Sequence, residues 1–256
     1  MQLFDSHCHL DDERFDSDRE ELISSLPGKE LVYCMCPGSD IPSSMRCAAL
    51  SEKYPFIYAA AGIHPHEAEK ASPDALDRLK ELLKLPKVKA LGEIGLDYYY
   101  DFSPRDIQKQ FFVDQMEIAV QNKKPVILHI RDAHGDMIDL MRSMPRLPEG
   151  IVHCFSGSTE VMKTYLSMGF FISFAGPVTF KKAPHLWEAA ALVPEDRLLI
   201  ETDSPYLAPE PVRGRRNDPS NVRYVCEKIA ALRGIDADSL SRITLLNALR
   251  IYHIDK

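Results

Sequence analysis

Eight short apolar runs, separated by polar or amphipathic stretches, are the feature that most limits the folds open to this chain. Most of the runs are continuously apolar, which is typical of parallel strands that are covered on both faces. The runs are Leu3–Asp5, Leu31–Cys36, Ile57–Ile63, Val88–Glu93, Pro125–Ile130, Ile151–Phe155, Phe170–Phe174 and Leu198–Thr202. The sequence therefore predicts an α/β protein with a parallel sheet.

Helical periodicity lies between these runs. The clearest example is residues 104–122, where apolar residues recur at spacings of three and four and form one stripe. Ser103 suits the N-cap of this helix, and Pro104 suits its first position. Similar patterns predict helices in the segments 72–83, 136–144, 219–232 and 238–252.

Strand and helix alternate often enough to favour a closed (β/α)8 barrel of the TIM type. An open doubly wound sheet is the alternative, but its Gly-rich first turn is missing, because the first run is followed by Ser6, His7, Cys8 and His9. No linker, repeat or low-complexity tract divides the chain, so we expect residues 1–256 to form one domain.

The charge balance restricts the partners that the chain can bind. Lys and Arg number 31 against 38 Asp and Glu, a net charge of -7. This excludes a broad basic face for nucleic acid, so a nucleic-acid enzyme would have to meet phosphate with bound metal and a few local cations. No apolar run approaches the roughly 18 residues of a membrane span, and the first ten residues lack the apolar core of a signal peptide. We expect a monomeric, cytoplasmic protein with no membrane partner.

The cysteines and several histidines are not expected to take part in the chemistry of a site. None of the six cysteines forms a C-x-x-C pair, so we expect reduced core thiols and neither a disulfide framework nor a cysteine zinc site. Cys8 and Cys154 alternate with histidines and are expected to face away from them and pack as small hydrophobic residues. Histidines in predicted loops and helices are expected at the surface, namely His66, His134, His185 and His253.

Six other titratable residues lie near the ends of predicted strands. They are His7, His9, Glu93, His129, His153 and Asp203. Strand side chains alternate with period two, so His7 and His9 point the same way, and the carboxyl ends of barrel strands meet at one mouth. A charge at the end of a buried strand is costly unless it is paired or bound to metal.

These six residues are better explained as metal ligands than as buried structural residues. Four imidazoles and two carboxylates can ligate one or two divalent cations, and Glu93 is the natural bridge because a carboxylate has two oxygens. Mixed nitrogen and oxygen ligands without thiolate point to Zn, Mn, Fe or Mg at a reactive site. The ligands alone do not select among these metals.

Several motifs carry a resemblance to a known family. They are DSHCHLDD (5–12), AAGIHPHEA (60–68), ALGEIGLDYYY (90–100), KPVILHIRDA (124–133), IVHCFSGS (151–158), LLIETDSPYLAP (198–209) and PVRGRRNDPSNV (211–222). In order and spacing they resemble the TatD family of metal-dependent deoxyribonucleases. The resemblance implies a (β/α)8 barrel and an Mg²⁺-dependent DNase, in several members with 3′→5′ exonuclease activity. It also implies that the six residues above are metal ligands. Since this chain keeps the first H-x-H pair, a binuclear site is favoured.

The resemblance also suggests roles in phosphodiester hydrolysis. Asp203 is the best candidate for the general base, kept ionised by the bound cation, although it could be a ligand without a proton role. Glu93 would take part as the bridging carboxylate. His64 would contact substrate, unless it caps a turn or supports a ligand.

Arginines near the mouth are the candidates for binding substrate phosphates. Arg131 shares strand parity with His129, and its guanidinium suits bidentate phosphate binding, although an ion pair with Asp132 or Asp203 is the alternative. A second set follows the last run and could hold a DNA strand or form a solvated loop: Arg213, Arg215 and Arg216.

Residues around the ligands suggest supporting roles. Glu201 and Asp5 have the parity of Asp203 and His7 and are expected one layer deeper, where they orient ligands or belong to a buried ion pair. Asp97 is expected on the loop above the mouth. The three tyrosines that follow it, residues 98–100, could stack on bases or form the buried side of that loop.

Two kinds of hydrolase fit these observations. The first is a deoxyribonuclease acting on single strands or ends. The alternative is another hydrolase on the same site, such as an aminoacyl-tRNA deacylase or a small phosphoesterase. A non-catalytic barrel would be expected to lack some of the six ligands, and all are present. The choice of DNA or RNA, the polarity, and exo- or endonuclease action stay open at this stage.

Overall fold

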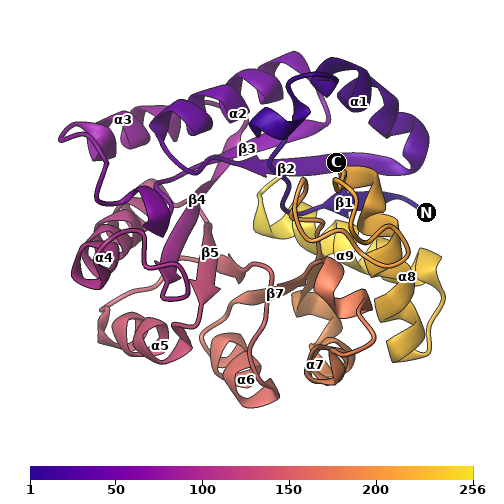
Figure 1. Ribbon diagram of the computed structural model, residues 1–256. Helices are drawn as coiled ribbons and strands as arrows, with labels where there is room; N and C mark the ends of the chain where they lie inside the picture. The colour runs from indigo at the N-terminus through magenta and orange to yellow at the C-terminus, as the bar shows by residue number, and fades with distance from the viewer. Residues whose placement is uncertain (256) are drawn as a thin grey trace.

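Eight parallel strands pair in chain order in the computed structural model, which describes residues 1–255. The strands are β1 (Leu3–Asp5), β2 (Leu31–Pro37), β3 (Ile57–Ala61), β4 (Val88–Asp97), β5 (Val126–Arg131), β6 (Gly150–Val152), β7 (Phe171–Phe174) and β8 (Leu198–Ile200). They curve around a common axis, with helices outside them (Figure 1). The predicted (β/α)8 barrel of the TIM type is therefore confirmed.

Hydrogen bonds join the first and last strands and nearly close the barrel. The amide of Ser6 donates to the carbonyl of Ile200 at 3.1 Å, and the amide of Asp203 donates to the carbonyl of His7 at 2.9 Å. A parallel bridge between Cys8 and Ser204 continues this seam. The seam places His7 and Asp203, which are far apart in the sequence, on adjoining backbone.

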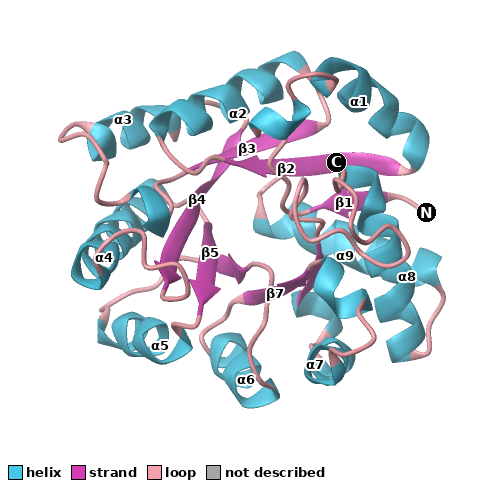
Figure 2. Cartoon of the chain, viewed as in Figure 1, coloured by secondary structure: helices cyan, strands magenta, loops and turns pink. Residues whose placement is uncertain are grey.

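Most of the helices form the outer ring of the barrel, and the last one lies across one end of it (Figure 2). They are α1 (Arg19–Ser25), α2 (Ile41–Lys53), α3 (Ala75–Leu82), α4 (Arg105–Asn122), α5 (His134–Ser143), α6 (Thr159–Ser167), α7 (Pro184–Leu192), α8 (Val222–Arg233) and α9 (Ala237–Ile251). The five predicted helices are present, with ends shifted by up to three residues. Four further helices, α1, α2, α6 and α7, were not among those predicted from the periodicity.

The start of α4 corrects one prediction. Pro104 occupies the N-cap position, and the helix begins at Arg105. Ser103 is not the N-cap: its hydroxyl is buried, donates to the carbonyl of His66 at 3.2 Å and accepts from the amide of Glu69 at 3.1 Å. It therefore ties the loop after β4 to the loop after β3.

The barrel interior is filled from all eight strands. One buried apolar residue of each strand joins a common cluster: Phe4, Met35, Ala60, Ala90, Ile127, Ile151, Phe171 and Leu199. Residues of α9 complete this cluster, and the hydroxyl of Tyr252 donates to the carbonyl of Ser6 at 2.8 Å. The amide group of Asn247 on α9 donates to the carbonyl of Leu198, where β8 starts. The helix thus covers the amino-terminal end of the strands, and the opposite mouth is left for the polar residues.

A second and larger apolar cluster fills the space between the strands and the outer helices. Cys8 belongs to it, as predicted, and is fully buried. Among the helices of residues 1–255, none combines the length and apolar character needed to cross a membrane.

Candidate metal centre

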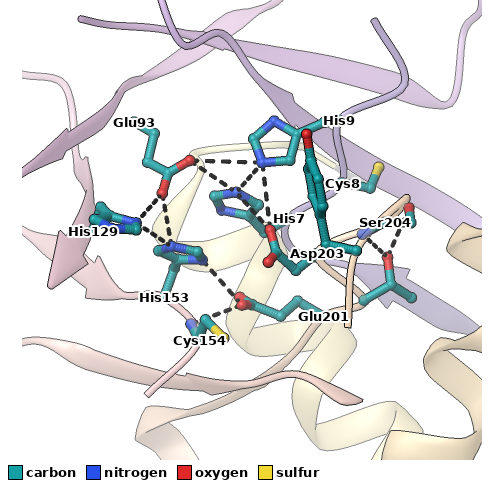
Figure 3. Close-up of polar contacts among 12 residues, drawn as sticks. His7, Cys8, His9, Glu93, His129, His153, Cys154, Glu201, Asp203 and Ser204 are labelled. Atoms are coloured by element: carbon teal, nitrogen blue, oxygen red, sulfur yellow. Dashed lines mark hydrogen bonds and ion pairs between the residues drawn. The ribbon is translucent and has the colours of Figure 1, made fainter. Parts of the chain in front are cut away.

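The six residues predicted as metal ligands meet at the carboxyl ends of the strands (Figure 3). His7 and His9 follow β1, His153 follows β6, and Asp203 follows β8, while Glu93 and His129 lie within β4 and β5. Gly95 allows these two strands to approach, because a Cβ at this position (φ +149°) would lie 1.9 Å from the carbonyl oxygen of His129.

Glu93 lies at the centre of this group, and its two oxygens face different imidazoles. Oε1 lies 2.8 Å from Nδ1 of His129 and 2.8 Å from Nε2 of His153. Oε2 lies 3.3 Å from Nε2 of His7 and 3.7 Å from Nε2 of His9. The side chain is 4% exposed, so water contributes little to its solvation. This is the arrangement expected of a carboxylate that bridges two positive centres.

Asp203 completes the half of the site that contains His7 and His9. Its Oδ1 lies 3.4 Å from Nε2 of His9 and 3.7 Å from Nε2 of His7. Asp203 has a left-handed backbone conformation, with φ of +56°. This region costs a non-glycine residue about 1 kcal/mol or more, and aspartate is one of the residues that adopt it most readily. The conformation turns the carboxylate toward the histidines.

The donor atoms fit divalent cations. Nε2 of His7 and Nε2 of His9 are 3.1 Å apart, and Nδ1 of His129 is 3.4 Å from Nε2 of His153. Lone pairs this close repel unless a proton or a cation lies between them, and neighbouring ligands of one ion with bonds of about 2.1 Å are similarly spaced. Nδ1 of His7 is buried and has no hydrogen-bond partner among the described residues, so the polar contacts of this ring are all made by Nε2, toward the site. Each half of the group could therefore hold one cation.

The carboxylates and imidazoles alter one another's acidity. Burial alone would raise the pKa of Glu93, but the charges of His153 and His7 outweigh it and hold the pKa well below its usual value. Burial lowers the pKa of His9, yet the hydrogen bond to Asp203 and the charge of Glu93 raise it to about 10. Burial would also raise the pKa of Asp203, but the hydrogen bond with His9 lowers it. Both carboxylates are therefore ionised and attract positive charge.

A second layer of carboxylates holds the imidazoles from behind. Oδ2 of Asp97 lies 3.0 Å from Nε2 of His129, and Oε1 of Glu201 lies 3.2 Å from Nδ1 of His153. Glu201 therefore lies one layer deeper, as predicted. Asp97 is not on a loop above the mouth: it is the last residue of β4 and is fully buried. Asp5 accepts from the amide of His7 at 3.3 Å, so it contacts this residue's backbone.

His64 lies closer to the centre than a substrate contact at the rim would. It is buried, and its Nε2 lies 3.7 Å from Oε1 of Glu93. Its Nδ1 accepts a hydrogen bond of 3.2 Å from the amide of His66, so it also caps the short 3-10 helix η3 (Pro65–Glu67). His64 is thus a further nitrogen donor available to the half of the site that contains His129.

Two buried glutamines on α4, which are not among the predicted site residues, hold the loops that carry these residues. Gln115 accepts from the amide of Ile63 at 2.8 Å and donates to its carbonyl at 3.0 Å. Gln108 makes the same pair of bonds with the backbone of Asp97, at 2.9 and 3.2 Å. The sequence feature that could have indicated them is a pair of glutamines, seven residues apart, on the otherwise apolar stripe of this helix.

The arginines predicted to contact substrate lie in different surroundings. The guanidinium of Arg131 lies over the rings of Tyr99 and Tyr100, 4.0 and 4.8 Å from their centroids, and forms no ion pair with Asp132, Asp203 or any other described residue. Arg213 is exposed, lies 4.2 Å above the ring of Phe180, and has Nη1 3.8 Å from Oε1 of Glu210.

The remaining two arginines of this loop differ from each other. Arg215 is exposed. Arg216 is held by Asp18, at 2.5 Å, and donates to the carbonyl of Arg14. It therefore links the loop after β8 to the segment before α1, and its charge is already paired.

Three predictions about neighbouring residues were wrong. His66 is not a free surface residue, because its Nε2 lies 2.9 Å from Oδ2 of Asp97. His134 is partly buried, and its Nδ1 lies 3.1 Å from the hydroxyl of Tyr165. Cys154 is partly exposed and has φ of +42°, so it is not a packed core residue. His185 and His253 are exposed, as predicted.

Comparison with known proteins identifies the family that shares this pattern. The model of the family described as TatD related DNase matches residues 4–253. The chain belongs to the TatD-related DNase family. The resemblance inferred from the motifs is therefore confirmed, and the match extends over nearly the whole barrel.

Relatives in this family align with the chain from end to end. The "uncharacterized metal-dependent hydrolase YabD" of Bacillus subtilis (strain 168) is 43% identical over 254 residues, which cover 99% of this chain and 100% of the relative. The "3'-5' ssDNA/RNA exonuclease TatD" of Erwinia tasmaniensis is 32% identical over 259 residues, which cover 98% and 100%. The chain is thus a metal-dependent hydrolase of the TatD family.

Solved structures extend the likeness to three dimensions. The crystal structure of YJJV, a TatD homolog from Escherichia coli K12, superposes with a TM-score of 0.92 at 30% identity and covers 99% of this chain and 98% of that one. A variant of organophosphorus hydrolase from Deinococcus radiodurans has a TM-score of 0.68 at 15% identity, covering 98% and 92%. The second likeness concerns the fold alone.

Proposed function

We propose that this TatD-family hydrolase is a nuclease that cleaves phosphodiester bonds of DNA, most readily at single strands or 3′ ends. The observation that carries the proposal is the position of Glu93 between two groups of imidazoles at the mouth of the barrel. Two divalent cations held by these groups would form a clamp for the oxygens of a phosphoryl group.

The ligands of the proposal are the six residues at the mouth. His7, His9 and Asp203 would hold one cation, His129 and His153 would hold the other, and Glu93 would bridge them. When bound, the cations supply an activated water and neutralise charge on the phosphate. The imidazoles suit Zn²⁺ and the carboxylates suit Mn²⁺ or Mg²⁺, so each of these three metals is a candidate.

Asp203 is the residue we assign as general base. Its side chain is 15% exposed, more than that of Glu93, so water can reach it. Its lowered pKa keeps it ionised at neutral pH and able to take a proton from water at Oδ1 or Oδ2. Glu201 would support the reaction indirectly by holding the ring of His153.

The phosphate contacts of the proposal come from a few cations at the rim. Arg131 has an exposed guanidinium group that forms no ion pair with the described residues. Arg213 and Arg215 are exposed in the loop after β8, although Arg213 also lies 3.8 Å from Oε1 of Glu210. His64 lies deeper and would contact the phosphate nearest the cations. Since Arg216 is paired with Asp18, we assign it to the loop structure. A nuclease with a net charge of -7 relies on such local contacts.

The relatives support this substrate without establishing it for this chain. Relatives named 3'-5' ssDNA/RNA exonuclease align with this chain over nearly all of their own length. A 3′→5′ direction and acceptance of RNA as well as DNA are therefore part of the proposal.

The experiment uses metal-stripped protein and an oligodeoxynucleotide labelled at one end and then at the other. Zn²⁺, Mn²⁺ and Mg²⁺ are added separately, and a duplex and an RNA strand of the same sequence are tested in parallel. We expect metal-dependent shortening from the 3′ end, lost in Asp203→Asn and retained in Asp196→Asn, which changes an exposed aspartate at the opposite end of the barrel. If no strand is cut with any metal, the nuclease proposal is wrong, and small phosphodiesters and aminoacyl-tRNA become the substrates to test.

A further inference from the structure

Three exposed aromatic rings lie together on the loop after β4. Tyr99 is 59% exposed, Tyr100 47% and Phe102 59%, and we call these three residues the aromatic platform. Single exposed aromatic residues are common on soluble proteins, whereas a contiguous group usually marks a binding surface. The platform is therefore a feature that the metal centre alone does not explain.

The rings of the platform are held in place. The amides of Tyr99 and Tyr100 donate to Oδ1 of Asp97 at 3.0 and 2.9 Å. The rings of Tyr100 and Phe102 are stacked, with centroids 5.0 Å apart and planes 22° apart. The guanidinium of Arg131 lies 4.0 Å above the ring of Tyr99. A surface ordered in advance loses little entropy when it binds a flat ligand.

The platform is continuous with the candidate metal centre. The ring of His66 meets the rings of Tyr100 and Phe102 edge-on, at centroid distances of 5.4 and 4.8 Å. Nε2 of His66 lies 2.9 Å from Oδ2 of Asp97, the same oxygen that contacts His129. One imidazole and one carboxylate thus separate the platform from a proposed metal ligand. The ring centroids of His66 and His129 are 6.1 Å apart, so the platform lies on the side of the site that contains His129.

We propose that the aromatic platform, with Arg131, binds an unpaired nucleobase of the strand whose phosphate lies at the metal centre. This inference rests on the proposed nuclease function. Bases stack on aromatic side chains, and the interaction tolerates any sequence. Arg131 has one face against tyrosine rings, while its N–H edge forms no ion pair with the described residues and is available to a phosphate.

The platform would favour single-stranded over double-stranded nucleic acid. In a duplex the faces of each base are covered by its neighbours, and only the terminal base pair exposes one face. A single strand can place a base on the rings at little cost. The preference for single strands follows from this stacking, which also supplies affinity that depends little on salt in a protein of net charge -7.

The test compares a strand that has bases with one that lacks them. Binding of a phosphorothioate oligonucleotide to the metal-loaded protein is measured by fluorescence anisotropy, and an abasic strand of the same length serves as the second ligand. 2-Aminopurine at each of the first positions from the 3′ end reports stacking by quenching. The variants are Tyr100→Leu/Phe102→Leu and Tyr99→Leu. The control is Tyr224→Leu on α8, where Arg223 lies 5.4 Å above the ring.

Wild-type protein should bind the normal strand at least about fivefold more tightly than the abasic strand for each stacked base. The double variant should lose this difference, together with the quenching at one position, and should keep its affinity for the abasic strand. Tyr224→Leu should behave as wild type. The platform proposal is wrong if wild type binds both strands equally, or if the variants keep the wild-type difference in affinity between the normal and the abasic strand. Strand cleavage would still support the nuclease function in either case.

The same variants also test whether the aromatic platform binds a second copy of the chain. If the platform instead covered a second copy of the chain, wild type would dimerise in sedimentation, the double variant would not, and strand binding would be equal in both. That result also overturns the proposal. Failure to cut any strand with any metal contradicts the nuclease function itself, which is a separate outcome.

Discussion

Asp97 accepts a hydrogen bond of 3.0 Å from Nε2 of His129, on the edge of the ring opposite Glu93. The other oxygen of Asp97 accepts from the amides of Tyr99 and Tyr100. One buried carboxylate therefore sets the tautomer and orientation of a proposed metal ligand and also shapes the loop that bears the exposed rings. Carboxylates behind ligand histidines commonly act in this way.

Replacement of Asp97 should weaken metal binding more than it alters the fold. In Asp97→Asn the amide oxygen can still accept from the two loop amides, but the negative charge behind His129 is lost. We expect metal affinity of the half-site containing His129 to fall by about 10- to 100-fold. Competition with a chromogenic chelator measures it. The control is Asp101→Asn, which changes an exposed aspartate paired with Arg105. Equal affinities in the two variants would show that Asp97 does not support the ligand.

Metal removal should lower the thermal stability of the protein. Most of the difference in Tm between the metal-loaded and the metal-free protein should require Glu93. An ion present at 100 times its Kd stabilises the folded state by about 2.7 kcal/mol. For a chain of this length that corresponds to roughly 5–10 °C in Tm. We expect this rise with Zn²⁺ or Mn²⁺ and its reversal by EDTA, measured by calorimetry.

The variant Glu93→Gln tests whether this stabilisation arises at the bridging carboxylate. It should lose most of the rise in Tm on metal addition, because both halves of the site lose a ligand. Glu188→Gln, at an exposed position of α7, is the matched control and should keep the rise. A full rise in Glu93→Gln would place the stabilising ions elsewhere.

The six proposed ligands could be found from the sequence because two regular geometries determine where they point. Strand side chains alternate with period two, and parallel barrel strands end at one mouth, so residues such as His7 and His9 converge. Asp97 escaped this reasoning because β4 is irregular: its register with β5 shifts between Leu91 and Ile94. The strand then continues four residues past Glu93, which the alternation of apolar residues does not reveal.

Contacts between distant segments were also beyond the sequence. Arg216 was expected at the mouth with its neighbours, but its partner Asp18 lies 198 residues away. His66 was expected at the surface, whereas η3 folds it back onto Asp97. Such pairings depend on the path of each loop, and loop residues carry no periodicity from which that path could be derived.

Gln115 should contribute to stability through the backbone that precedes His64. Gln115→Leu keeps the approximate volume of the side chain and leaves the amide and carbonyl of Ile63 without their partner. Each unsatisfied buried group costs about 1–3 kcal/mol, so the free energy of unfolding should fall by roughly 2 kcal/mol or more. Urea denaturation measures it. Gln110→Leu, on the exposed face of α4, should change stability by less than about 0.5 kcal/mol. If both variants lost the same free energy of unfolding, the effect would lie in α4 itself and not in the hydrogen bonds of Gln115 to Ile63.

His134 should make the protein less stable as the pH falls. Burial lowers its pKa below the ordinary value of 6.5, so the unfolded chain binds this proton more readily than the folded one. The free energy of unfolding therefore decreases as the pH drops below about 6.5 toward the folded pKa, by at most about 1.4 kcal/mol per pH unit. In His134→Gln this dependence should be shallower than in wild type when urea denaturation is repeated between pH 7.5 and pH 5. His185→Gln, at an exposed position of α7, is the control. Parallel pH profiles for wild type and His134→Gln would mean that the ring is protonated equally in the folded and unfolded states.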